Sequence, residues 1–342
     1  MADQLRVIDF GLSSPLRSQS SWHAVAYGVS AGTPATMSFT RPAAPYVCLG
    51  YHRGIDEVDG EYCREQQLPV LRRMVGGGPV YLDTHQLFFQ ICVPASSVPA
   101  VRAQALFKLL EPAVAAFCAL GVPAVLDEDQ EICVGDRKIC GHGAGQIEDA
   151  VVVCGNLIER FDYERATRVL ALADAEQAEQ TLALMRRFVA ATPVDPVAFQ
   201  AAVIDAYASA LGLEPAPGEL TEAECLALVD LDERFSGEAW TKGADRPAPS
   251  SVRGPSSNQV KVRAGVFTYA GAFNGARVSA SVVKGILQRV RITDAKLNGS
   301  TREAERALLG ASLQSVPKVL AGFGEAGGRI AAAFAAADPG RI

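Results

Sequence analysis

Short apolar runs separated by turn residues fill the first half of the chain. Six of these runs have the length and the Gly, Pro or Asp borders of β-strands, at residues 5–11, 35–40, 45–51, 68–74, 79–83 and 87–93. Between and after them, apolar residues at i, i+3 and i+4 predict amphipathic helices at 58–67 and 101–121. This alternation predicts an α+β domain built on a mixed sheet.

The second half repeats the pattern on a smaller scale. Strands are expected at 131–141 and 150–158, helices from Tyr163 to Leu211, and a linker at Glu214–Gly218. A stronger linker, rich in Pro, Ser and Gly, covers 243–259. Beyond it, three expected strands are followed by short helices and an Ala-rich final helix, at 259–273, 276–285, 287–294, 302–310, 316–323 and the C-terminal end. We therefore predict a larger domain over 1–248 and a smaller α+β domain over 249–342.

Charge and cysteine usage exclude several classes of function. The formal net charge of -6 gives no global electrostatic case for binding nucleic acid or an anionic membrane. The N-terminus does not read as a secretory signal, and no apolar run approaches the roughly 20 residues that span a bilayer, so we expect a cytoplasmic protein. Eight cysteines show no CxxC pair and no metal-ligand spacing with histidine. We identify no metal ligands and expect most of the thiols to be reduced core residues.

The segment 72–83 is the first candidate for chemistry. Arg72 and Arg73 supply fixed positive charge and forked donors just before Gly76, Gly77 and Gly78. Three glycines let a backbone approach a ligand closely. This combination suits a phosphate or a carboxylate, although a Gly triplet before a strand is more often a flexible turn.

The segment 131–143 is the second candidate. It places Lys138 in an apolar strand that runs into a turn containing Gly141 and His142. A rigid backbone there could hold the ammonium against a phosphate or a carboxylate oxygen. The alternative is a lysine at a sheet edge whose charged end reaches water.

Together the two segments resemble the biotin/lipoate A/B protein ligase family, which carries an RRxSGGGxVxHD-like loop and a GRKISG-like strand about sixty residues later. Here the corresponding text is RRMVGGGPVYLD and GDRKICG. PYVCLGYHRGIDEVD and EAWTKGADRP are further similar stretches, and the region after residue 250 is similar to the accessory domain of longer ligases. The resemblance implies a mixed-sheet catalytic domain over 1–248 and an accessory domain over 249–342.

The resemblance also implies a reaction and a site. Lipoate or octanoate and ATP, with Mg²⁺, would form an acyl-adenylate, and a lysine of a lipoyl carrier domain would then displace AMP. Lys138 would be catalytic and would contact the carboxylate and the α-phosphate. The adenylate would be bound by Lys138 together with Arg73, Gly76, Gly77, Gly78, Pro79, Val80 and Tyr81. The substrate pocket would include Arg72, Asp83, Gly141, His142 and Cys154. Val80, Phe88 and residues 45–51 are possible walls for the acyl chain.

Departures from the family keep two alternatives open. Leu82 stands where the family usually has histidine, and Pro79 has no N–H to donate. These two residues suggest a module that binds lipoyl carriers without chemistry. Cys154 suggests an octanoyl or lipoyl transferase that holds the acyl group as a thioester, provided that Lys138 lies close enough to lower the pKa of the thiol. A buried structural cysteine is the more common reading of such a residue.

Overall fold

The computed structural model describes residues 4–243, 257–294 and 301–336, and the chain divides into two compact units. The first unit contains residues 1–169 and 190–247, and the second contains residues 170–189 and 248–342. The linker and the boundary predicted from the sequence fall largely on 244–256, outside the described residues, and the assignment of roles to two domains stays a prediction. One feature was not part of that prediction: the internal segment 170–189 belongs with the C-terminal part of the chain.

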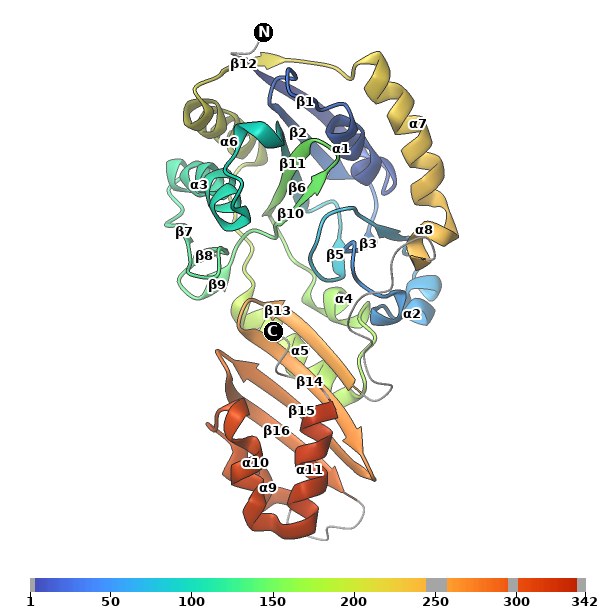
Figure 1. The fold of residues 1–342 in the computed structure, drawn as a ribbon, viewed down its shortest axis with the longest axis vertical. Coiled ribbons are helices and arrows are strands. Elements are labelled where there is room, and N and C mark those ends of the chain that lie inside the picture. The colour runs from blue at the N-terminus through green and yellow to red at the C-terminus, as the bar shows by residue number, and fades with distance from the viewer. Residues whose placement is uncertain (1–3, 244–256, 295–300, 337–342) are drawn as a thin grey trace. The chain divides into compact units, whose positions relative to one another are not determined.

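A six-stranded mixed sheet forms the centre of the first unit (Figure 1). Its strands, in spatial order, are β10 (Gly143–Ile147), β11 (Ala150–Ile158), β6 (Gln86–Pro94), β2 (Thr36–Pro42), β1 (Gln4–Ser13) and β12 (Glu214–Pro217). Strand β1 runs parallel to β2 and β12, whereas the pairings of β2 with β6, β6 with β11 and β11 with β10 are antiparallel. The predicted α+β class with a mixed sheet is confirmed.

Helices cover both faces of this sheet, because its central strands alternate apolar side chains between the two faces. In β6, Phe89 and Ile91 join a buried cluster with residues of α3 (Arg102–Ala119) and α6 (Pro196–Leu211). Cys92 of the same strand points to the other face of the sheet. It packs with Trp22 and Val25 of α1 (Arg17–Tyr27). Helix α7 (Glu222–Ser236) lies outside α1 and contacts it (Figure 1).

Two small three-stranded sheets carry the segments that the sequence singled out. The first has the order β4-β3-β5 and the second the order β7-β8-β9. Their strands are β3 (Tyr46–Leu49), β4 (Val70–Arg72), β5 (Val80–Leu82), β7 (Val125–Leu126), β8 (Ile132–Val134) and β9 (Arg137–Lys138). Three short helices complete the first unit: α2 (Gly60–Glu65), α4 (Tyr163–Arg168) and α8 (Glu238–Lys242).

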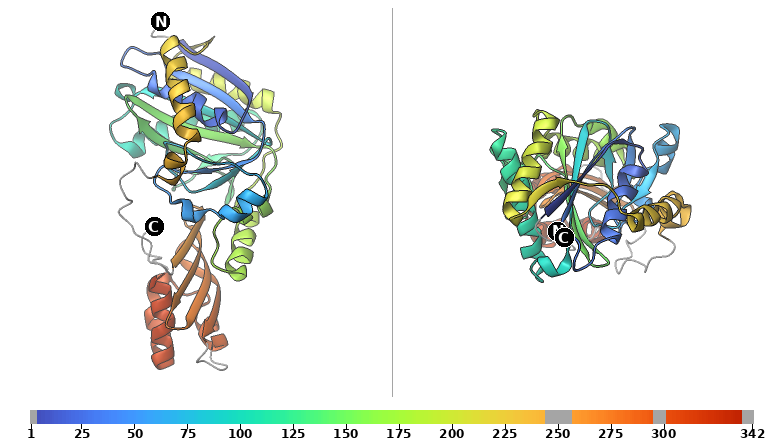
Figure 2. Two further views of the ribbon diagram at one scale, coloured as in Figure 1. Left: turned by 90° about the vertical axis from the view of Figure 1, so that its right-hand side faces the viewer. Right: turned by 90° about the horizontal axis from the view of Figure 1, so that it is seen from above.

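The second unit is an antiparallel sheet with helices on both faces. Its strands in order are β13 (Ser257–Arg263), β14 (Val266–Phe273), β15 (Ala276–Val283) and β16 (Ile286–Asp294). Phe267 and Tyr269 of β14 pack with residues of α9 (Thr301–Leu308), α10 (Val316–Leu320) and α11 (Gly324–Ala336), and Figure 2 shows these helices together on one face of the sheet. Thr268 lies on the opposite face and hydrogen bonds, oxygen to oxygen at 2.8 Å, with Thr181 of α5 (Ala175–Phe188).

Three details differ from the sequence prediction. Residues 214–218, predicted as a linker, contain β12, whose two prolines are tolerated because it is an edge strand. Residues 259–273, predicted as one strand, contain the end of β13 and all of β14. Gly265, with a φ of +69°, allows the tight turn between them. Helix α7 was not predicted at all.

None of the described helices combines the length and the apolar character needed to cross a bilayer.

Candidate active site

The glycine loop between β4 and β5 folds around Arg73. The guanidinium of Arg73 donates to the carbonyl oxygens of Gly76 at 2.8 Å, Gly78 at 3.0 Å and Cys48 at 3.0 Å. Gly77 has a φ of +103°, and a Cβ there would lie 2.6 Å from Nη2 of Arg73. The loop therefore needs glycine at Gly77. The guanidinium of Arg73 thus binds carbonyl oxygens of the loop and of β3. Its predicted contact with an adenylate stays a prediction.

Arg72 has a structural position. It is fully buried, with 0% of its surface exposed. Its guanidinium donates to the carbonyl oxygens of Arg53 at 2.6 Å, Gly50 at 2.9 Å and Thr241 at 2.6 Å, and its Nε donates to that of Trp240 at 3.1 Å. These bonds join β4 to the turn after β3 and to α8. The geometry favours this scaffolding role over the predicted one in the substrate pocket.

His23 of α1 fixes the start of the glycine loop. Its Nε2 accepts the backbone N–H of Met74 at 2.9 Å, and its Nδ1 lies 2.7 Å from the carbonyl oxygen of Gln19. Burial lowers the pKa of His23 from 6.5 to about 3; the bond to Gln19 opposes this, and the charges of Arg73 and Arg234 add to it. His23 is therefore a neutral acceptor at physiological pH.

Lys138 lies at the end of the β8–β9 hairpin, where it pairs with Cys133. Its Nζ lies 3.1 Å from Oε1 of Glu131, and the two side chains are 18% and 6% exposed. The carbonyl oxygen of Lys138 accepts the N–H of Ala190 at 2.8 Å. The lysine is thus held at both its backbone and its ammonium. It lies on an edge strand, as in the alternative interpretation, but its charged end pairs with Glu131 rather than reaching freely into water.

The turn after Lys138 meets the glycine loop. Asn156 of β11 accepts the N–H of Gly141 at 2.7 Å and donates to Gln86 at 3.0 Å. Beyond this turn, a Cβ on Gly143 would lie 3.3 Å from the carbonyl oxygen of Gly76. The two segments singled out by the sequence therefore approach each other here, with His142 partly buried between Gly141 and Gly143.

Strand β5 carries two predicted nucleotide contacts, Val80 and Tyr81, and ends just before Asp83, which was predicted for the substrate pocket. Tyr81 is buried, and its hydroxyl accepts from Arg165 at 3.4 Å. Burial raises the pKa of Tyr81 above its usual range. Asp83 is 8% exposed and accepts the N–H of His85 at 2.9 Å. Val80 is 38% exposed, so of these three residues it is the most available to a ligand.

Leu82 is a core residue. It packs with Tyr46 and Cys48 of β3 and with Phe88 of β6. The histidine usual in the family is therefore replaced by an apolar contact. Tyr46, Cys48 and Phe88 were expected to line the acyl chain. In the structure their side chains pack in this same core cluster.

Cys154 does not have the environment of an activated thiol. It is partly buried in β11 and packs against the cluster that contains Cys92. Burial raises the pKa of its thiol well above the usual range; Cys92 and Cys48 raise it further, and only Arg73 lowers it. The condition set for an activated thiol, a nearby Lys138 that lowers this pKa, is not met, because Lys138 is not among the groups that act on Cys154. The charge of Lys138 acts on Cys140, whose pKa burial nevertheless raises to about 11.

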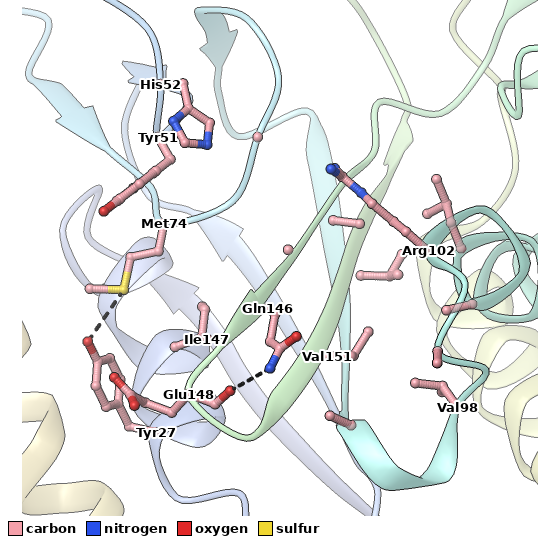
Figure 3. Close-up of a pocket in the computed structure, with 18 of the residues that line it drawn as sticks. Tyr27, Tyr51, His52, Met74, Val98, Arg102, Gln146, Ile147, Glu148 and Val151 are labelled. Atoms are coloured by element: carbon pink, nitrogen blue, oxygen red, sulfur yellow. Dashed lines mark hydrogen bonds between the residues drawn. The ribbon is translucent and has the colours of Figure 1, made fainter. Parts of the chain in front are cut away.

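A pocket of about 890 Å³ lies around the tip of the β10–β11 hairpin (Figure 3). Tyr27 and Met74, joined by a bond from the hydroxyl to Sδ at 3.7 Å, line it on the α1 side. Arg102 at the start of α3 lines it on the other side, and Gln146 of β10 lies between them. Two residues that the sequence singled out lie in its lining: Gly76 of the glycine loop and Tyr51, at the end of the segment expected as a wall for the acyl chain. The pocket thus borders the glycine loop without including Lys138.

Asp127, Glu131 and Cys133 form a group of possible metal ligands among the described residues. The ligand atoms of Asp127, Glu131 and Cys133 lie within 4.8 Å of one another. Mg²⁺ takes oxygen ligands rather than a thiol, and Glu131 already binds Lys138. The group does not fit Mg²⁺, and we assign no ion to it.

Two residues that organise this site, Glu131 and Asn156, were not among the candidates from the sequence. Each is a polar residue that is at most 5% exposed. Asn156 stands in an otherwise apolar strand, and since buried polar groups are nearly always hydrogen bonded, that position was the available signal. Glu131 follows Asp127, Glu128, Asp129 and Gln130, so nothing in the sequence separated it from a solvated acidic run. The sequence could not identify the partners, which come from distant segments.

Comparison with known proteins agrees with this geometry. Residues 23–192 match the family described as "Lipoyl protein ligase A/B catalytic domain". "Lipoate--protein ligase 1" of Staphylococcus aureus is 29% identical over 147 residues, which are 43% of this chain and 44% of that protein. The chain thus spans less than half the length of this relative. "Octanoyltransferase LipM" of Symbiobacterium thermophilum is 25% identical over 257 residues, 66% of this chain and 92% of that protein.

The fold has solved counterparts. One is a structure from Thermoplasma acidophilum, described as a bi-partite lipoate protein ligase and its E2 lipoyl domain. It superposes with a TM-score of 0.66 at 23% identity, over 71% of this chain and 98% of the other. Ligases and an octanoyltransferase are thus both among the proteins that this chain resembles. Residues 23–192 of this chain thus belong to the family of lipoyl protein ligase A/B catalytic domains.

Proposed function

We propose that this protein activates lipoate or octanoate with ATP and transfers the acyl group to a lysine of a lipoyl carrier domain. The observation that carries the proposal is the placement of Lys138. Its ammonium is largely buried and ion-paired, on a hairpin whose following turn adjoins the glycine loop. A fixed positive charge beside backbone donors is what an acyl-phosphate transition state requires.

Two steps follow from this assignment. In the first, a carboxylate oxygen of the acid attacks the α-phosphorus of ATP, and pyrophosphate leaves as the acyl-adenylate forms. Mg²⁺ bound with ATP would neutralise the leaving pyrophosphate. In the second, the ε-amine of the carrier lysine attacks the acyl carbonyl, AMP leaves and the nitrogen loses a proton. In both steps Lys138 stabilises the negative charge on the oxygens around the reacting centre.

The ligase from S. aureus and the complex from T. acidophilum support a lipoyl carrier domain as the acceptor. The cytoplasmic location expected from the sequence stays a prediction.

The test is to incubate the protein with lipoate and a lipoyl domain, with and without ATP and Mg²⁺, and to weigh the acceptor by intact-mass spectrometry. We expect a lipoyl mass gain that requires ATP and is lost in Lys138→Ala. Lys108→Ala, which removes an exposed lysine of α3, is the matched control and should retain the gain. Binding of the carrier without any mass gain would support a module that lacks chemistry.

A second candidate is acyl transfer from one carrier to another without ATP. The similarity to an octanoyltransferase over 92% of its length favours it, whereas the raised pKa of Cys154 argues against that residue as the nucleophile. An ATP-independent mass gain from an octanoylated carrier would support transfer and overturn the ligase proposal.

A further inference from the structure

Glu131 forms an ion pair with Lys138, and its carboxylate is almost fully removed from water. A lysine side chain has four rotatable bonds, and holding it in one conformation costs roughly 2 kcal/mol of rotamer entropy. The ion pair with a buried carboxylate orders the lysine side chain in the free protein, so that this entropy is not lost again when a ligand binds. It also leaves the other two N–H donors of the ammonium for other acceptors.

The position of Glu131 is itself fixed by the chain around it. Oδ1 of Asp127 accepts the backbone N–H of Glu131 at 2.8 Å and that of Asp129 at 3.0 Å. The carbonyl oxygen of Asp127 accepts a separate N–H, from Gln130. Directly after Glu131, β8 pairs with β9, so that Cys133 stands opposite Lys138. The turn at 127–131 and the hairpin together set the distance between carboxylate and ammonium.

We propose that Glu131 is a positioning residue for Lys138: it aims the ammonium at the reacting phosphate and carboxylate oxygens through the ion pair at 3.1 Å. This inference rests on the proposed role of Lys138. Glu131 does not contact the reacting atoms itself. Because the aimed charge matters most in the transition state, loss of Glu131 lowers the rate of adenylate formation more than the affinity for substrate.

The experiment measures acyl-adenylate formation from lipoate and ATP in single turnovers, which gives a rate and an apparent Kd. Glu131→Ala should lower the rate by roughly tenfold or more with little change in Kd, since small displacements of a catalytic group cost up to about a hundredfold. Glu131→Gln should lose less, because its amide oxygen still accepts a weaker neutral bond. Asp129→Asn, which removes an exposed charge from the same turn, should equal the wild type. Thermal unfolding confirms that each variant is folded.

Lys138→Gln separates this role from a merely structural one. In that background no ammonium remains to be aimed, so adding Glu131→Gln should leave the residual rate unchanged, as well as the Kd for a non-hydrolysable lipoyl-sulfamoyl adenosine. An equal loss in both backgrounds would overturn the inference, and so would a Glu131→Ala variant with the wild-type rate. If the wild type makes no adenylate, or if Lys138→Gln is fully active, the proposed function fails and the inference falls with it.

Discussion

Arg72 and Trp240 hydrogen bond to each other in both directions. Nε1 of Trp240 donates to the carbonyl oxygen of Arg72 at 2.9 Å, and Nε of Arg72 donates to the carbonyl oxygen of Trp240 at 3.1 Å. The indole also stacks on Phe235 and lies under the guanidinium of Arg234. Residues 168 positions apart in the chain thus fix the strand that leads into the glycine loop.

Trp240→Phe should destabilise the first unit by roughly 1–3 kcal/mol, because a buried carbonyl loses its donor. Arg72→Lys should cost at least as much, since an ammonium cannot replace the fork that bonds several carbonyls. Urea unfolding followed by tryptophan fluorescence reports on this unit in Arg72→Lys, because Trp22 and Trp240 both lie in it. Circular dichroism serves for Trp240→Phe. Because either change loosens α8, the double variant should lose less than the sum; strict additivity would contradict this coupling.

His23 should make the stability of the first unit depend on pH. Its pKa is about 3 in the folded chain and about 6.5 when unfolded. Its contribution is therefore complete above pH 6.5 and is lost as the pH falls toward 3, because the unfolded chain takes up a proton first. At pH 5 this amounts to about 2 kcal/mol relative to pH 7.

The measurement is urea unfolding of wild type and His23→Gln between pH 5 and pH 7.5. A glutamine side chain at this position can keep one polar contact but cannot titrate, so the variant should be less stable at pH 7 and should lose less stability on acidification. Equal slopes in the two proteins would show that other groups cause the pH dependence.

Cys154→Ala should keep most of the ATP-dependent ligase activity, because a thiol whose pKa burial raises is a poor nucleophile. Cys92→Ala is a matched control on the same face of the sheet, and it packs in the same cluster. Each variant should be less stable by about 1 kcal/mol. The measurement is the acceptor mass gain beside a thermal melt. If Cys154→Ala lost its activity with the fold intact while Cys92→Ala stayed active, the result would support the hypothesis of acyl transfer through Cys154.

Truncation after residue 247 should yield a poorly soluble protein. Helix α5 would remain while the sheet that it covers is removed, so that Leu184 and Phe188, which pack with Val266, become exposed. Adding Leu184→Gln and Phe188→Gln to the truncated chain should restore solubility, as measured by light scattering. A soluble truncation without these changes would show that α5 does not depend on the sheet.

The sequence predicted the fold class and most elements, since strands such as β6 and β11 are continuous apolar runs and the stripe of α3 has a clear helical period. It also identified the two loops that meet at Gly76 and Gly143. It could not assign Arg72, because a pair of arginines beside glycines looks the same whether the donors bind carbonyls or phosphate. Helix α7 was missed because four of its fifteen residues are buried, which leaves only a weak apolar stripe.

The chain passes between the two units at three places, near residues 169, 189 and 247. A gene that gained or exchanged the C-terminal sheet by a single fusion would therefore deliver it without α5, which is encoded well upstream in the middle of the other unit. The two units therefore cannot be exchanged as whole segments of the gene. Recombination at one junction would pair α5 of one protein with the C-terminal sheet of another, and the side chains between them would not have evolved together.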